Sequence, residues 1–163
     1  MLIDATGEIA DGWAEIADDA DIPWHGPIIV PFARLDEALT RRPSTGVALP
    51  NDTEIDAVVP YLPRLGLVAV DFPSFADGRG FSIGQALRDR RFEGRLRAVG
   101  PVIADQFAYL LACGFDEVKV PEHVALRQPV EQWMAQLSKV TLGYQRGRPV
   151  RGSILDQRHG GTA

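Results

Sequence analysis

Three short apolar runs alternate with two helix-like segments between residues 67 and 120, and this alternation restricts the fold more than any other feature. The runs are Leu67–Val70, Leu96–Val99 and Val118–Val120, and helices are predicted over Phe81–Arg91 and Val102–Cys113. Short apolar runs separated by helices are typical of parallel strands joined by crossover helices. Ligands of such sheets bind beyond the carboxyl ends of the strands, so the loop after the first run is the expected ligand site.

The same alternation extends to both sides of this stretch. Upstream, the runs Ile28–Phe32 and Gly46–Leu49 are each followed by a predicted helix, the first over Leu35–Arg41 and the second over Ile55–Leu62. The apolar residues of the second helix have the i, i+3, i+4, i+7 spacing, and prolines within it should shorten it. A last helix is predicted over Glu131–Gly143. The pattern as a whole predicts an α/β protein with a parallel sheet of about five strands.

Two architectures fit five strands that alternate with helices. One is an open, doubly wound sheet of the flavodoxin type, with helices on both faces. The other is a curved sheet that resembles half of a (β/α)8 barrel. A closed barrel needs roughly 200–250 residues, and the chain has 163. We therefore expect the open flavodoxin-like sheet in preference to the partial barrel.

The composition indicates a globular protein. Apolar residues make up 45% of the chain, and no apolar stretch approaches the roughly 18–20 residues that a membrane-spanning helix needs. Residues 1–4 lack the basic and apolar regions of a signal peptide. Cys113 is the single cysteine, which excludes an internal disulfide. A cytoplasmic protein that does not bind membranes is the expectation.

Charge divides the chain into three parts. Residues 1–22 contain seven acidic side chains and no basic one, so residues 1–25 are predicted to form an acidic segment, either a short helix or a hairpin over the sheet edge. Residues 26–144 are predicted to form a single α/β domain. Residues 145–163 form a basic, glycine-rich tail that is expected to be loose. The tail has neither interleaved aromatic residues nor a basic helix face, which argues against a nucleic acid as the main partner.

The loop between residues 71 and 82 is the candidate binding site. It places Arg79 between Gly78 and Gly80, shortly before Ser82 at the predicted start of a helix. Free N–H groups at a helix N-terminus and a guanidinium fork together suit an anion such as phosphate, a sulfur oxyanion or a carboxylate. The loop lacks the Gly-Lys-Ser/Thr core of a P-loop. The alternative is a structural turn in which the arginine pairs with Asp71 or Asp77.

Three aspartates are candidate catalytic residues. Asp71 is predicted at the carboxyl end of a strand and Asp77 in the loop that follows, positions suited to an acid/base carboxylate. Asp105 and Gln106 open the next helix and are expected to line the same crevice. Each aspartate has a structural alternative, because a carboxylate can also cap backbone N–H groups of a loop or helix.

Other reactive residue types give weaker signals. Arg95 and Arg97 alternate on one predicted strand face, so they are expected either to meet carboxylates or to lie on an exposed edge. Cys113 lies in a buried-looking helix, which favours a packing role. The three histidines are scattered and form no metal-binding pattern, so no metal site is predicted. No sequence motif identifies a cofactor, which leaves the cofactor unknown.

The chain resembles the bacterial domain-of-unknown-function family number 934. The resemblance rests on Asp71–Ser82, which reads DFPSFADGRGFS, on Leu87-Arg88, on Leu96–Gly100, on Asp105-Gln106 and on Cys113–Asp116. It extends over roughly residues 26–145, and the DGRGFS loop is its most specific part. The acidic N-terminal segment and the basic tail are more individual.

The resemblance implies a setting rather than a reaction. Family members are commonly encoded beside sulfite reductase and phosphoadenylylsulfate reductase and are often labelled as oxidoreductases, and the family supplies no catalytic residues. The expectation is therefore an accessory protein of sulfate or sulfite reduction that binds an anion, a nucleotide or a partner reductase. Two alternatives remain, an enzyme that acts on a small phosphate- or oxyanion-bearing molecule and an interaction module without pocket chemistry. A homodimer is left open.

Overall fold

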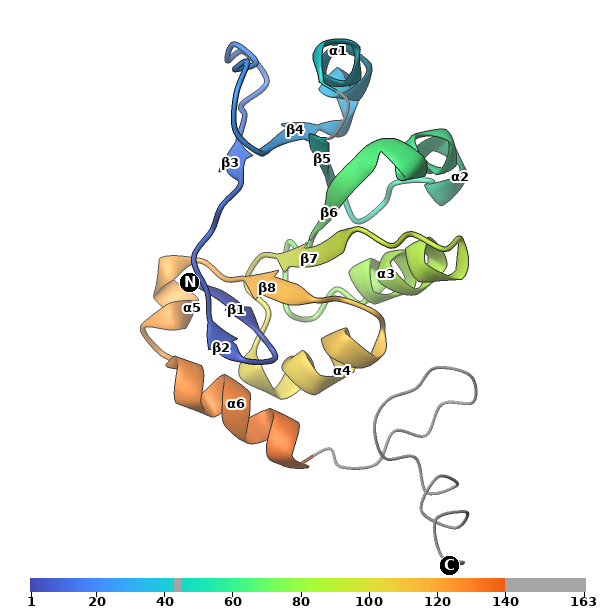
Figure 1. Cartoon of the computed structure of the whole chain (residues 1–163). Helices are drawn as coiled ribbons and strands as arrows, with labels where there is room; N and C mark the ends of the chain where they lie inside the picture. Colours follow the sequence, from blue (N-terminus) through green and yellow to red (C-terminus); the bar gives the residue numbers. More distant parts are fainter. Residues whose placement is uncertain (43–44, 140–163) are drawn as a thin grey trace, which may run out of the picture.

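Eight strands form one curled sheet that remains open between its two edge strands (Figure 1). The computed structural model describes residues 1–42 and 45–139. Neighbouring strands follow one another across the sheet in the order β2-β1-β8-β7-β6-β5-β4-β3. Their bounds are Leu2–Asp4 (β1), Gly7–Glu8 (β2), Ala14–Glu15 (β3), Ile28–Pro31 (β4), Thr45–Leu49 (β5), Leu65–Asp71 (β6), Arg95–Val99 (β7) and Glu117–Lys119 (β8).

The strands from β3 to β8 are parallel and lie side by side in chain order, whereas β1 and β2 are antiparallel additions beside β8. Helices connect the strands from β4 to β8, whereas residues 16–27 between β3 and β4 contain none. α1 to α4 all lie on the convex side of the sheet (Figure 1). The helices are α1 (Leu35–Arg41), α2 (Ile55–Val58), α3 (Arg79–Asp89), α4 (Phe107–Ala112), α5 (Glu122–Ala125) and α6 (Val130–Lys139), with 3-10 turns η1 (Phe32–Arg34), η2 (Val59–Arg64) and η3 (Ala104–Gln106).

This strand order makes the sheet a half-barrel. Each right-handed crossover advances by one strand in the same direction, so every crossover helix is placed on the same face. The twist between strands then curls the sheet around its uncovered face, as in half of a (β/α)8 barrel. The preference for a flavodoxin-like sheet of about five strands was therefore wrong. That arrangement requires one reversal of strand order and helices on both faces, and the partial-barrel alternative describes the architecture.

The main hydrophobic core lies between the convex face and the helices. Alternate strand residues such as Val47, Val68 and Leu96 point into it and are fully buried. Aromatic rings fill the space beneath α3, where Phe72 makes edge contacts with Phe81 and Phe115. These contacts fix the start of α3 against the carboxyl end of β6.

The sequence located the central elements within a few residues. The predicted helix over residues 35–41 coincides with α1, and the five predicted strands correspond to β4 to β8. The helix predicted from Ile55 to Leu62 ends at Val58 and continues as the 3-10 turn η2, which contains Pro60 and Pro63. α6 ends at Lys139 in the described range; residues 140–143 of the predicted helix and the tail at 145–163 lie outside it. None of the helices in the described ranges is both long and apolar enough to cross a membrane.

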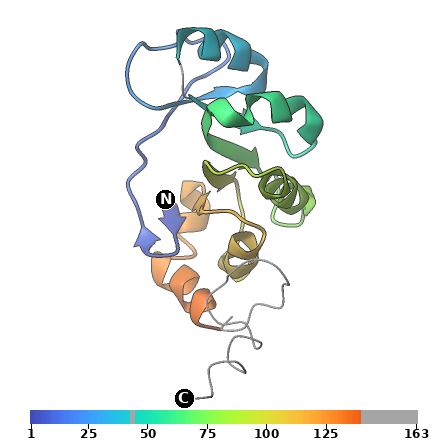
Figure 2. The ribbon, with the colours of Figure 1, turned by 45° about the vertical axis from the view of Figure 1, so that its right-hand side comes forward.

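The acidic N-terminal segment reaches both edges of the half-barrel. Its first part is a hairpin and not the short helix that was the other alternative. β1 pairs with β2 and also with β8. The chain then runs along the uncovered side of the sheet to β3, which pairs with β4 at the opposite edge (Figures 1 and 2). Residues 1–25 thus supply three strands of the same sheet.

Candidate functional site

The concave face of the half-barrel is apolar on one side and charged on the other. In its middle row, the register places Pro31, Ala48, Ala69, Arg97 and Glu117 next to one another on β4 to β8. The residues on β4 to β6 are small or apolar, and those on β7 and β8 are charged. Because no crossover helix covers this face (Figure 1), its two halves can serve different purposes.

A cleft of about 680 Å³ opens over the apolar half, at the carboxyl ends of the strands. A volume of this size is within the range of small-molecule sites. Small side chains on the strands leave this space free, since Ala48 and Ala69 project little from the sheet. Apolar and small residues of the strands, of η1, of the loop after β5 and of α2 complete the lining, among them Ile29, Phe32, Ala33, Pro50, Ala57 and Val99.

Asp71 is the last residue of β6 and lines this cleft. Although Asp71 is exposed to the cleft, the protein around the carboxyl group removes part of its hydration. This desolvation raises the pKa of Asp71 above its ordinary value, and the N–H of Phe72 only partly opposes the shift. Among the residues described by the structure, no lysine or arginine forms an ion pair with Asp71. The group is suited to transfer a proton or to pair with a ligand.

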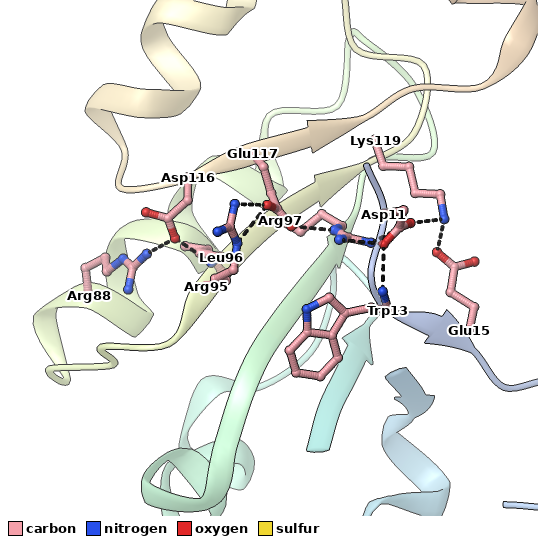
Figure 3. A network of polar contacts seen from close by, with 10 residues as sticks. All are labelled: Asp11, Trp13, Glu15, Arg88, Arg95, Leu96, Arg97, Asp116, Glu117 and Lys119. Carbon is pink, nitrogen blue, oxygen red and sulfur yellow. Dashed lines mark hydrogen bonds and ion pairs between the residues drawn. The ribbon is translucent and has the colours of Figure 1, made fainter. Parts of the chain in front are cut away.

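A network of alternating charges occupies the other half of the concave face (Figure 3). Its six residues are Arg95, Glu117, Arg97, Asp11, Lys119 and Glu15. The Arg97 side chain bonds to Glu117 at 2.7 Å and to Asp11 at 3.0 Å. Arg95 also pairs with Glu117. Asp11 accepts a further bond of 2.8 Å from Lys119. The expectation that the two arginines meet carboxylates or lie on an exposed edge is resolved in favour of carboxylates.

This network holds the N-terminal segment on the half-barrel. Lys119 binds Asp11 and, at 2.9 Å, Glu15 of β3, so one ammonium group contacts two points of the segment. Burial alone would raise the pKa of Asp11, but hydrogen bonds from Lys119 and Arg97 outweigh it and lower the pKa to about 2. Between these acids, Trp13 packs its ring on the apolar strand residues beside the cleft. The network therefore positions Glu15 and Ile16, which form one wall of the cleft.

Arg79, the predicted anion ligand, is paired within its own loop. Its guanidinium donates two hydrogen bonds to the Asp77 carboxylate, at 3.1 and 2.7 Å. These bonds strongly lower the pKa of Asp77 and raise that of Arg79. The Arg79 side chain is 60% exposed. The arrangement is the structural alternative named above, and binding of an anion by this loop stays a prediction.

The two glycines beside Arg79 have different surroundings. Gly78 precedes α3 and has open space around it, whereas Gly80 is buried and packs against the ring of Phe72. Gly80 therefore permits close packing of α3 on the core. Ser82 lies inside α3 and is exposed.

Asp105 and Gln106, which were predicted to line the same crevice as Asp71, contact different parts of the structure. Asp105 accepts a 2.6 Å hydrogen bond from Gln136 of α6 and lines a smaller, polar hollow of about 410 Å³ between η3 and α6. Gln106 donates a 2.7 Å hydrogen bond to the carbonyl of Phe75 and so ties η3 to the loop after β6. Neither residue lines the cleft beside Asp71.

Of the eight predicted site residues, all within the described ranges, Asp71 alone lines the cleft. Sequence reasoning missed the small residues on β5 and β6 that create the space. Their signal was present, because Gly46, Ala48 and Ala69 share one strand face where bulky residues would be usual. Glu15 and Ile16 carried no such signal, since β3 joins the sheet through a long-range pairing.

Potential metal ligands are dispersed over the described part of the chain. Within residues 1–42 and 45–137, no group of three or more histidine, cysteine, aspartate or glutamate side chains is arranged to hold a metal ion. Cys113 is buried, and burial raises the pKa of its thiol. A buried neutral thiol is a poor nucleophile and a poor metal ligand, in agreement with a packing role.

Comparison with known proteins identifies a family. A search of curated proteins finds no match to the chain. A family model described as "Bacterial protein of unknown function (DUF934)" matches residues 46–152, a stretch that runs from β5 past α6 and contains the DGRGFS loop. This match covers 107 of the 163 residues. The chain therefore belongs to the DUF934 family of bacterial proteins.

Proposed function

We propose that this protein binds a small, largely apolar molecule in the concave cleft. The observation that carries the proposal is an open cleft of about 680 Å³ with apolar walls at the carboxyl ends of β4 to β7 and a desolvated carboxyl group, Asp71, beside it. Clefts with mostly apolar walls and few polar groups are the usual sites of small ligands. The carboxyl end of a parallel sheet is also where α/β proteins place their ligands.

A fragment titration tests this proposal. Full-length protein labelled with ¹⁵N is titrated with small aromatic fragments, and we expect the shifted amide signals to cluster at Ala48, Ala69 and Val99. Ala57→Trp places a bulky ring at an exposed position of the cleft wall and should abolish these shifts. Ala76→Trp, at an exposed position outside the cleft, is the matched control. Fragments that shift other regions, or that bind Ala57→Trp equally well, would contradict the proposal.

A second candidate is an enzyme in which Asp71 acts as a general acid or base on the bound molecule. It is favoured by the raised pKa of Asp71, since efficient proton transfer needs a pKa closer to neutrality than that of an ordinary aspartate. Carboxyl ¹³C NMR of Asp71 across a pH titration measures this pKa directly. A value at or below that of an exposed aspartate would rule this candidate out.

The biological setting that we propose is sulfate or sulfite reduction, as an accessory protein. Its support is membership of the family together with the gene neighbours that the resemblance implies. We expect deletion of the gene to slow growth on sulfate or sulfite as the sulfur source and to leave growth on cysteine unchanged. Equal growth of deletion and parent strains on all three sources would remove this part of the proposal.

A further inference from the structure

The charged side chains that line the cleft all have the same sign. They are Glu15, Glu54 and Asp71, and no lysine, arginine or histidine belongs to the lining within the described ranges. Glu15 shares its charge with Lys119 at 2.9 Å. Glu54 and Asp71 form no ion pair with any described residue. The cleft therefore has two carboxyl groups whose charge the described residues leave uncompensated.

The apolar walls make this imbalance more important. Charges interact more strongly where protein replaces water, because the local dielectric constant is lower. A bound anion would lose hydration and also meet carboxylates of its own sign. A bound cation would lose hydration but gain carboxylate partners, while its apolar part covers Ala48 and Ala69.

An organic cation fits this cleft better than a metal ion. The described residues contain no cluster of three or more potential metal ligands, and a metal ion would leave the apolar walls without a partner. A molecule with a cationic group and an apolar body can pair with the carboxyl groups of the cleft and also cover its apolar walls.

Resting on the proposed function of the cleft, we propose that its ligand is a cationic amphiphile, an apolar or aromatic body that carries an ammonium group. The apolar body lies on Ala48, Ala69 and Ile29, and the ammonium group pairs with Asp71 and Glu54. Desolvation raises the pKa of Asp71, and an ammonium group beside the carboxylate would offset this cost by favouring its charged form. Oxyanions bind the cleft less well than cations, and the predicted anion site at the Arg79 loop is separate from it.

Three probes with the same ring and different charge test this selectivity. They are 2-naphthylmethylamine, 2-naphthalenemethanol and 2-naphthoate, a cation, a neutral molecule and an anion at pH 7. Their dissociation constants are measured from the ¹⁵N shifts of the cleft amides in the full chain. We expect the amine to bind about two- to fivefold more tightly than the alcohol, the range of a partly exposed ion pair, and the carboxylate to bind more weakly than both.

Variants connect this preference to the two carboxyl groups. Asp71→Asn and Glu54→Gln keep the side-chain size and should each reduce the advantage of the amine over the alcohol, with the double variant losing it. Asp89→Asn, at the far end of α3 and outside the cleft lining, removes the same net charge and should leave the advantage intact. If Asp71→Asn does not fold, Glu54→Gln in the exposed cleft wall gives the same comparison.

The outcomes separate this inference from the function on which it rests. If the alcohol shifts the cleft amides and the amine has no advantage, or the carboxylate binds as well as the amine, the inference fails and the apolar binding site stands. An amine advantage that survives in the double variant also overturns the inference. If no probe shifts the cleft amides, both proposals fail.

Discussion

Arg97 and Glu117 form an ion pair on adjacent parallel strands in which each side chain is only 1% exposed, with 2.7 Å between Arg97 Nε and Glu117 Oε1. Such a pair needs further partners, because two desolvated charges rarely compensate each other completely. Asp11 is the second partner of Arg97, and Arg95 is the second partner of Glu117. The N-terminal segment thus helps to neutralise a buried charge of the sheet through Asp11.

Removal of Glu117 should destabilise the protein strongly. Glu117→Ala leaves Arg97 buried with only Asp11 as a partner, and loss of one member of a buried pair typically costs about 3–5 kcal/mol. Asp56→Ala is the control, since its pair with Arg90 is exposed and worth no more than about 1 kcal/mol. Urea unfolding measures both. Equal losses for the two variants would show that burial of the Arg97–Glu117 pair is unimportant.

Asp11 should make stability depend on acid pH. Its pKa in the folded state, about 2, is below the ordinary 3.8, so its stabilising contribution is present above pH 3.8 and is lost as the pH falls towards 2. Asp11→Asn should lower the free energy of unfolding at pH 6 and flatten its pH dependence between pH 4 and 2. Asp18→Asn, which removes the same charge at an exposed position of the same segment, is the matched control. Parallel profiles for wild type and Asp11→Asn would contradict the assignment.

The glycines beside Arg79 should respond differently to alanine. A Cβ at Gly80 would lie 2.5 Å from Phe72 Cζ, whereas one at Gly78 would have no neighbour within 4 Å. Overpacking of this kind typically costs about 1–3 kcal/mol, so Gly80→Ala should be destabilised by that amount. For Gly78→Ala we expect a change of less than about 1 kcal/mol. Thermal unfolding compares the two, and similar effects would be evidence against the tight packing of α3 on Phe72.

Cys113 should be protected from alkylation. Its thiol is buried, and burial raises its pKa, so little thiolate is available at pH 8. Iodoacetamide should label the native protein far more slowly than the urea-unfolded protein, as followed by mass spectrometry. Rapid labelling of the native protein would show that α4 opens readily.

Local sequence patterns predicted the elements well because their causes are local. The helix at residues 35–41 and the effect of Pro60 and Pro63 on its successor depend on nearby residues. The order of the strands in the sheet does not depend on nearby residues. The same local pattern allows a crossover to place the next strand on either side of the previous one. One clue favoured the half-barrel. A face covered by helices would be apolar throughout, and the face of Arg95 and Arg97 is not.

The candidate site depends less on local sequence patterns than the fold does. The position of Asp71 beside the cleft could be predicted because the end of a strand is recognisable in the sequence. Arg79 was predicted to bind an anion, and the pair that it forms with Asp77 is the structural alternative that the sequence also offered. The cleft depends on the absence of bulk at Ala48 and Ala69 and on a wall from β3, and neither follows from a motif.

The pairing of β1 with β8 has a consequence for biosynthesis. Leu2 leaves the ribosome long before its partner Lys119 has been translated, so the first strand waits without its neighbour while the rest of the sheet grows. Contacts this distant in the chain form slowly and leave strand edges exposed in the meantime. Completion of the half-barrel is therefore one of the last events in the maturation of the newly made chain.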